Sequence, residues 1–389
     1  MTPTLRHRLT VTGYALLGLL SAGALLAGYG GMVSPQFSTI PAILALTFPG
    51  WLILELLALV LCLIFCRRMA LVPALTLLLL AGPILTFFPL NFHTHRLTPQ
   101  EQKSSFSLVS YNVFTYYDFN AHYGPDNPLP SFDELKRQMA EGRLNTSALY
   151  LIDTRPDIAC LQEAPQPVEY APYFMNADMA EEMKSIFPFR GGMNGQDIYT
   201  RYPAREITLR QPESIYSWFG GALVDIDGHE TLVISVHMQS IGLNDDDKQL
   251  IDRLAEGEAA GKVKAVRHQL LGKLSAAFRE RAIQARLLRQ QIDSIGVRNV
   301  IVAGDFNDIP GCYACRIIAG DDFRSAFAEA GIGPTFTYHG NRLYFNIDHI
   351  FYRGDMQPYE FERIKTGWSD HYPICAKFYW KDPTIQPVG

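Results

Sequence analysis

The chain has 389 residues, of which 48% are hydrophobic, and its 34 basic and 39 acidic residues give a net charge of −5. This length allows more than one domain. The composition changes near position 96: only six charged residues precede it, whereas positions 97–389 carry 29 basic and 38 acidic residues. That acidic balance excludes a general attraction of the C-terminal part to polyanions. The six cysteines are too few for a dense disulfide framework in a chain of this size.

The first 96 residues are expected to form a membrane anchor with three transmembrane helices, at about 9–33, 43–65 and 69–90. Each stretch is apolar and close to the ~20 residues that span hydrocarbon. Basic residues lie before the first stretch and at Arg67–Arg68, so these two regions are expected in the cytoplasm. Three spans would then place everything after about position 91 on the extracytoplasmic side of the membrane.

Other arrangements of this anchor remain open. The first stretch could be a signal peptide, although its apolar run exceeds a normal signal core. Pro49, Pro73 and Pro83 interrupt the next two stretches, which could form a re-entrant segment or a two-span hairpin. Glu55 could be functional or could face the interior of the helix bundle. A transporter is a further alternative, but one intramembrane acid without a repeat offers it little support.

From Phe106 onward the pattern becomes that of a water-soluble α/β domain, which we expect to occupy positions 97–389. Short apolar runs predict strands at 106–113, 158–161, 197–202, 222–227, 231–235, 300–303, 345–352 and 373–379. Helical spacing of apolar residues predicts helices at 131–153 and 246–293.

The most informative stretch is Asn299–Asp308, which reads N-V-I-V-A-G-D-F-N-D. Its apolar run has no helical period and predicts a short strand that is buried on both faces. Asp305 and Asn307 follow two residues apart, so a continuing strand would place both side chains on one face. A carboxylate and an amide in that arrangement suit a cation and a phosphate oxygen. The alternative is a β-turn that uses Asp and Asn only for their turn geometry.

Polar residues of ligand type recur at or beside the ends of six predicted strands. They are Asn112, Glu163, His237, Asp305 with Asn307, Asp348 with His349, and Ser369–Asp370–His371. Each alone could be an ordinary turn or a hydrogen-bonded structural residue. Together they predict one site, because ligands gather at one edge of the strands in open sheets. Oxygen ligands favour magnesium, manganese or calcium over zinc or copper.

Seven short motifs, in order along the chain, resemble those of the endonuclease/exonuclease/phosphatase family. They are S-Y-N-V (110–113), P-D-I-A-C-L-Q-E (156–163), I-Y-T-R-Y-P (198–203), S-V-H-M-Q-S (235–240), G-D-F-N-D-I-P (304–310), I-D-H-I-F (347–351) and S-D-H-Y-P-I (369–374). The resemblance covers positions 106–380. It implies a four-layer α/β sandwich, in which two β-sheets pack face to face and helices flank them.

The resemblance also implies a role for each polar residue. Glu163 is expected as the principal metal carboxylate, with Asn112 and Asp370 beside it. Asp305 is expected to orient or deprotonate the attacking water, and Asn307 to hold a phosphate oxygen. The remaining three residues are His237 and His371, which would contact the phosphate or protonate the leaving oxygen, and Asp348, which would orient His371. The general base stays undecided, because coupled groups share their titration.

The segment 262–289 is rich in Lys and Arg and carries apolar residues at helical spacing. One interpretation is an amphipathic helix that covers the sheet and exposes a solvated basic face. The other is a patch that contacts lipid headgroups or another polyanion.

These observations predict a divalent-metal-dependent hydrolase of phosphoester bonds, with Mg²⁺, or Mn²⁺ or Ca²⁺, as its cofactor. Its expected partners are a phosphoester substrate and the lipid bilayer, with no obligate protein partner. The substrate stays open among lipid headgroups, nucleic acid and small phosphoesters. A metal-dependent endonuclease acting on DNA or RNA is one alternative. A non-catalytic binding module is another, although all eight candidate site residues are present.

Overall fold

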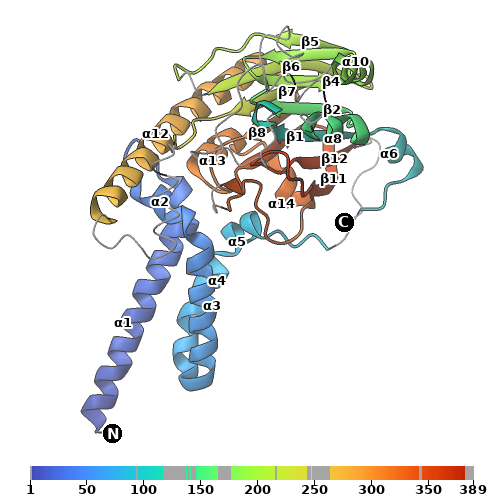
Figure 1. Ribbon diagram of the computed structural model, residues 1–389. Helices are drawn as coiled ribbons and strands as arrows, with labels where there is room; N and C mark the ends of the chain where they lie inside the picture. Colours follow the sequence, from blue (N-terminus) through green and yellow to red (C-terminus); the bar gives the residue numbers. More distant parts are fainter. Residues whose placement is uncertain are drawn as a thin grey trace.

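The computed structural model describes residues 2–92, 95–116, 137, 141, 146–164, 177–214, 217–242, 247, 263–340 and 344–381. In these ranges the C-terminal part folds into two six-stranded sheets that pack face to face, with helices on both outer faces (Figure 1). The predicted α/β sandwich is therefore confirmed.

The first sheet has the order β11-β12-β1-β2-β4-β3. Its strands are β11 (Met356–Arg363), β12 (Ile374–Trp380), β1 (Ser105–Asn112), β2 (Ile158–Gln162), β4 (Gln196–Thr200) and β3 (Phe189–Met193). Pairing is parallel between β1 and β2 and antiparallel between the other neighbours. The mixed sheet thus brings the C-terminal ends of β1 and β2 to one edge.

The second sheet has the order β5-β6-β7-β8-β10-β9. Its strands are β5 (Ala204–Ile207), β6 (Trp218–Ile226), β7 (His229–His237), β8 (Asn299–Asp305), β10 (Asp348–Arg353) and β9 (Arg324–Ser325). The pair β7 and β8 is parallel, and the other neighbours are antiparallel. All seven residues of β8 are buried, as its continuous apolar run predicts for a central strand.

The core has three layers of apolar side chains. Between the sheets lie residues of both, such as Leu108 and Ile158 of the first and Ile301 and Ile350 of the second. Outside the first sheet, α8 (Thr146–Thr154) and α10 (Ala177–Ile186) cover a second layer. Outside the second sheet, α12 (Val263–Ile295) and α13 (Tyr313–Ala319) cover a third. Among the described residues the domain also has three short helices: α6 (Pro99–Lys103), η3 (Phe114–Tyr116) and α14 (Ala326–Ala330).

Four strands of the sandwich were not predicted from the sequence: β3, β5, β9 and β11. In β11 the cause is Pro358, which lacks a backbone N–H and therefore argues against a strand in a sheet interior. The structure accommodates it because β11 is an edge strand, paired only with β12 among the described strands. The predicted helix 131–153 is described as a helix over Thr146–Thr154, and most of its earlier part lies outside the described residues.

The N-terminal helices form a bundle whose long helices project from the sandwich (Figure 1). They are α1 (Pro3–Gly28), η1 (Gly30–Met32), α2 (Ile40–Leu46), α3 (Phe48–Phe65), η2 (Arg67–Ala70), α4 (Leu71–Leu79) and α5 (Ala81–Phe87). Among the described residues two helices, Thr4–Gly28 and Phe48–Phe65, are long and apolar enough to cross a membrane. A third span exists only if Arg67–Leu79 and Ala81–Phe87, which are bent by 57°, count as one.

The prolines explain where the predicted second and third spans break. Pro83 cannot donate to the Leu79 carbonyl one turn earlier, and that carbonyl instead accepts a hydrogen bond of 2.6 Å from the Tyr29 hydroxyl. The predicted helix 43–65 is divided at Thr47, and Pro49 lies in the first turn of the second piece. Glu55 is fully buried, as expected for an acid that faces the bundle interior.

The segment between α1 and α3 packs directly against the sandwich. Gln36 Nε2 donates to the Arg279 carbonyl (2.9 Å), and the Thr39 and Ser275 hydroxyls share a hydrogen bond of 3.0 Å. Ala45 belongs to the same apolar cluster as β7, β8 and α12. On the other side of the bundle, Asn91 Nδ2 donates to two carbonyls beside α14 (2.9 and 2.8 Å). The helical bundle is therefore docked on the sandwich through side chains of both.

Candidate active site

The predicted site residues lie where the central strands of the two sheets end. Asn112 ends β1, and Glu163 follows β2, whose last residue, Gln162, pairs with Asn112. In the second sheet, His237 ends β7 and is in register with Asp305 at the end of β8. Asp305 is in turn paired with Asp348, the first residue of β10. Because β10 is antiparallel to β8, its beginning meets the carboxyl end of β8 at one edge.

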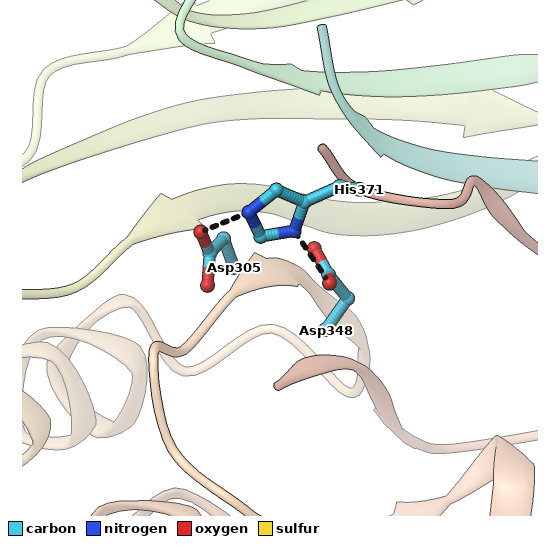
Figure 2. A group of neighbouring side chains, drawn as sticks. All are labelled: Asp305, Asp348 and His371. Atoms are coloured by element: carbon cyan, nitrogen blue, oxygen red, sulfur yellow. Dashed lines mark hydrogen bonds and ion pairs between the residues drawn. The ribbon is translucent and has the colours of Figure 1, made fainter. Parts of the chain in front are cut away.

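Figure 2 shows His371 between the carboxylates of Asp305 and Asp348. His371 Nδ1 lies 2.9 Å from Asp348 Oδ2, and Nε2 lies 3.5 Å from Asp305 Oδ2. All three side chains are buried. Burial opposes protonation of His371, but the negative charges of Asp348 and Asp305 outweigh it and raise the pKa of His371 well above its usual value. These charges therefore favour the protonated imidazole, which can donate from both ring nitrogens.

Asn112 joins the two sheets at the centre of the site. Its Nδ2 donates to Glu163 Oε1 (3.0 Å) and to Asp305 Oδ2 (3.2 Å). Its oxygen accepts a hydrogen bond of 3.1 Å from the Phe114 amide, which fixes the orientation of the side-chain amide. His237 Nε2 lies 3.7 Å from Glu163 Oε1 and 3.6 Å from Asp305 Oδ2. Glu163, Asp305 and His237, at the ends of three different strands, thus face one another.

Two of these residues have backbone conformations that are costly for a residue with a Cβ. Glu163 has φ 53° and Asn307 has φ 52°, in the left-handed region. Such strain costs on the order of 1 kcal/mol or more and persists where the surrounding structure imposes it, often at functional sites. Asn307 is therefore not on a continuing strand: β8 ends at Asp305, and the prediction that a strand places both side chains on one face was wrong.

The turn after β8 nevertheless keeps Asn307 close to Asp305. The backbone N–H of Asn307 donates to Asp305 Oδ1 (2.8 Å), and the side-chain Nδ2 of Asn307 donates to the Met238 carbonyl (3.0 Å). These bonds tie the loop after β8 to the loop after β7. The amide nitrogen of the side chain has a second hydrogen that the bond to Met238 does not use.

Six of the eight predicted residues line one cavity of about 880 Å³. They are Glu163, His237, Asp305, Asn307, Asp370 and His371. The other two, Asn112 and Asp348, are buried directly behind them and hold Glu163, Asp305 and His371 by hydrogen bonds. His349, grouped with Asp348 in the sequence, points elsewhere: its Nε2 donates to the Asp308 carbonyl at 2.8 Å.

The carboxylates of the cavity repel one another. Burial raises the pKa of Asp370 to about 6, with further contributions from the charges of Glu163 and Asp305 and an opposing one from His371. Burial also raises the pKa of Asp305. A cation between carboxylates relieves such repulsion, and carboxylate oxygens are the ligands that Mg²⁺, Mn²⁺ and Ca²⁺ prefer. The donor set therefore fits a hard divalent cation.

The position of that cation follows from the hydrogen bonds. Asp305, Asp348 and His371 are close enough to one another to surround an ion. However, both nitrogens of His371 already face carboxylates, which is the arrangement of a hydrogen-bonded imidazolium rather than a metal ligand. Glu163 and Asp370 remain as the carboxylates that face the cavity, and the imidazole near Glu163, that of His237, lies 3.7 Å from Oε1. They are the residues that could hold a cation.

Sequence reasoning missed several residues of the cavity wall. Tyr338 lines it, and its ring lies 5.1 Å from that of His371. Arg281 also lines it, although it is buried, donating to Asp308 Oδ2 (3.2 Å) and to the Gln239 carbonyl (2.8 Å). From the sequence, Arg281 belongs to the basic segment 262–289. The helical pattern of that segment does not show that the Arg281 side chain points into the protein. Leu46 of α2 contributes to the wall from the N-terminal bundle.

Three more of the described basic side chains of α12 are also held by other groups of the protein, whereas Arg279 is exposed and donates to the Pro35 carbonyl at 3.4 Å. Lys273 pairs with Asp247, Arg286 donates to the Tyr313 hydroxyl (3.1 Å), and Arg289 pairs with Asp322 (2.6 Å). For the part of α12 whose side chains are described, this favours a helix that covers the sheet over a headgroup-binding patch.

Comparison with known proteins agrees with this architecture. The family model described as "Endonuclease/Exonuclease/phosphatase family" matches residues 109–371, and a "Domain of unknown function (DUF8431)" matches residues 11–87. A search of curated proteins finds no match.

Solved structures similar to the chain include truncated TDP2 from Caenorhabditis elegans (15% identity, 71% of this chain and 98% of that chain, TM-score 0.43). Two others are described as endonuclease/exonuclease/phosphatase proteins. One, from Bacteroides vulgatus, has 15% identity, covers 71% of this chain and 99% of that chain, and has a TM-score of 0.43. The other, from Beutenbergia cavernae, has 17% identity, 72% coverage of both chains and a TM-score of 0.44. Because the family model matches more than half of the sequence, the chain belongs to the endonuclease/exonuclease/phosphatase family.

Proposed function

We propose that this protein is a divalent-metal-dependent hydrolase of phosphoester bonds, anchored in a membrane with its catalytic domain on the extracytoplasmic side. The observation that carries the proposal is the convergence of Glu163, Asp305, Asp370, His237 and His371 on one cavity. Acids that can hold a cation, a buried carboxylate and two imidazoles are the groups that phosphoester hydrolysis needs.

Each group has a role that its contacts suit. Glu163 and Asp370 would hold the divalent cation, which would supply Lewis-acid polarisation of a phosphoryl oxygen. Asp305 Oδ2 accepts the proton of the attacking water or orients that water. His371 donates from Nε2 to a phosphoryl or leaving oxygen. Asp348 Oδ2, 2.9 Å from His371 Nδ1, accepts the hydrogen bond from that nitrogen and keeps the ring oriented. His237 Nε2 and the free hydrogen of Asn307 Nδ2 bind the remaining phosphoryl oxygens.

The topology part of the proposal rests on where the charges lie in the bundle. Arg6 and Arg8 lie at the beginning of α1, and Arg67 and Arg68 lie at the end of α3. These two regions are at the end of the bundle away from the sandwich (Figure 1). With the basic end in the cytoplasm, the sandwich lies on the opposite side of the bilayer.

Hydrolysis of bis-p-nitrophenyl phosphate by the full chain in detergent, with Mg²⁺ or Mn²⁺, tests this function. We expect Glu163→Gln and His371→Ala each to lower kcat/KM on the order of 10²-fold or more, because each removes a group acting on the transition state. Glu206→Gln, at an exposed position on β5, should leave the rate unchanged. Chelation should abolish turnover, and added Mg²⁺ should restore it and raise the Tm of the wild type more than that of Glu163→Gln.

Two results would contradict the proposal. Turnover that survives both site substitutions would show that the reaction happens elsewhere. Turnover that is insensitive to chelation would remove the cation from the mechanism.

A further inference from the structure

The cavity that holds the candidate catalytic groups has a second, apolar half. Leu46, Leu270, Leu274 and Phe278 line it together with Ile309 and Phe345. None of these side chains can act on a phosphoryl group. Their presence beside Glu163 and His371 indicates that the cavity accommodates more than a phosphoester and polar substituents.

This apolar wall is built jointly by the N-terminal bundle and the catalytic domain. Leu46 is the last residue of α2, and Leu270, Leu274 and Phe278 recur at helical spacing on α12. Gln36 and Thr39 hold the segment before α2 against α12 through their bonds to Arg279 and Ser275 (2.9 and 3.0 Å). Leu46 therefore completes the wall only when the bundle is docked.

The position of Leu46 in the chain places this wall near the bilayer. Leu46 precedes by two residues Phe48, the first residue of a helix long and apolar enough to span. At ~1.5 Å per helical residue, two residues correspond to a few ångströms along an axis. Met32, Phe37 and Ile40, in the same segment between α1 and α3, are 58%, 88% and 66% exposed. Exposed apolar side chains beside a spanning helix are suited to the headgroup–acyl boundary.

The charges of the described cavity wall are poorly suited to a polynucleotide. Among the described residues that line it, Arg281 is the one Lys or Arg, and its guanidinium is bonded to Asp308 and the Gln239 carbonyl. A polynucleotide binds through several cations that neutralise successive phosphates. The described wall offers apolar surface in place of those cations.

We propose that the substrate is an amphiphilic phosphoester drawn from the bilayer, whose apolar chain lies along Leu46, Leu270, Leu274 and Phe278 while its phosphoryl group meets Glu163 and His371. This inference rests on the proposed function and specifies its substrate. The docked bundle has two tasks in this arrangement. It tethers the domain, and it supplies part of the surface on which the apolar chain lies.

The test uses the full chain in phosphatidylcholine vesicles. The substrates are three phosphate diesters with the same p-nitrophenyl leaving group, namely methyl, octyl and hexadecyl p-nitrophenyl phosphate. Each methylene of an alkyl chain that is buried favours binding, so we expect kcat/KM to rise at least about tenfold from the methyl to the octyl ester. The hexadecyl ester, which resides in the bilayer, should be used at least as well as the octyl ester.

Wall variants separate this effect from a general affinity of the vesicles for long chains. Leu46→Gln and Leu274→Gln should each lower the octyl-to-methyl ratio several-fold, and the ratio within one variant does not depend on how much of the protein is folded. Ile283→Gln is the matched control, because Ile283 lies on the same helix α12, is 47% exposed and does not line this cavity. Its ratio should equal that of the wild type.

The possible failures are distinguishable. A wild-type ratio near one, with the methyl ester hydrolysed, would overturn the lipid substrate and leave the phosphoester hydrolase intact. Use of the octyl but not the hexadecyl ester would replace the bilayer source with a soluble amphiphile and overturn the inference. Failure to hydrolyse any ester beyond the rate of Glu163→Gln would instead overturn the proposed function.

Discussion

At the scale of single residues, the candidate site depends on how a few buried polar groups orient one another. Asp348 does not line the cavity, yet its carboxylate lies 2.9 Å from His371 Nδ1 and fixes which way that ring points. Asn112 similarly holds Glu163 and Asp305 at 3.0 and 3.2 Å. Its expected role as a metal ligand stays a prediction, but its amide N–H groups face these carboxylates and its oxygen is occupied by the Phe114 amide.

Substitution of Asp348 tests this positioning role. We expect Asp348→Asn to lower kcat on the order of 10²-fold with little change in KM, because the imidazole loses the acceptor that orients it. The negative charges of Asp348 and Asp305 outweigh burial and raise the pKa of His371. Loss of one of these charges lowers that pKa, so the protonated form and the activity should disappear at a lower pH in the variant than in the wild type.

The measurement is the pH profile of kcat and kcat/KM on bis-p-nitrophenyl phosphate. Asp321→Asn, at an exposed position in the loop after α13, is the control and should leave both profiles unchanged. An alkaline limb at the same pH in wild type and Asp348→Asn would contradict the role of this pair.

At the scale of elements, the site depends on how closely the parallel strands β7 and β8 approach. Gly304 precedes Asp305 and has φ 149°, and a Cβ added there would overlap the Val236 carbonyl oxygen of β7. Glycine is therefore required for the backbone at the end of β8 to lie against β7 and to present Asp305 beside His237.

Two glycine-to-alanine substitutions should have opposite effects on stability. Gly304→Ala should destabilise the protein by ~2 kcal/mol or more, because it combines strain with a backbone clash in the core. Gly272→Ala, inside α12 where a Cβ meets no neighbour within 4 Å, should stabilise it by ~0.5–1 kcal/mol through helix propensity. Thermal unfolding of both variants in the same detergent checks the two signs, and equal Tm values would contradict the argument.

At the scale of the whole molecule, the bundle and the sandwich pack directly against each other. A Cβ at Gly31 would overlap the Gly311 carbonyl oxygen, so the turn after α1 touches the loop that leads into α13. The boundary near position 96 stays a prediction. In the structure, Ala45 already packs in the cluster that contains β7 and β8, and Leu46 lines the cavity.

Cysteine labelling in intact cells tests the proposed orientation. Cys66 is exposed and lies beside Arg67, at the end of the bundle away from the sandwich, whereas Cys375 of β12 is half-buried and the other four cysteines are buried. With Cys375→Ser as the starting chain, a membrane-impermeant maleimide should therefore label the protein only after the cells are opened. Asp321→Cys adds an exposed thiol on the sandwich and should be labelled from outside in intact cells. Labelling of Cys66 in intact cells would reverse the orientation.

Local sequence patterns predict many of the strands of the sandwich and the residue types of its site. The apolar run of β8, the alternating burial of β12 and the polar residues at strand ends depend only on neighbouring residues, since side chains alternate and strands end at turn formers. These local patterns therefore identified most of the strands and the residue types of a phosphoester site. The family motifs added which strands lie together.

The tertiary structure alone decided what depends on contacts between distant segments. The sequence did not predict β11 because Pro358 argues against a strand, and only the sheet order shows that β11 is an edge strand, where a proline is tolerated. Asn307 lies outside β8 because its hydrogen bonds to Asp305 and Met238 impose a left-handed turn. Arg281 is buried and Leu46 lines the cavity for the same reason, because both positions result from the packing of α12 and α2 against the sheet. Periodicity records which face of an element is apolar, and only packing determines what that face meets.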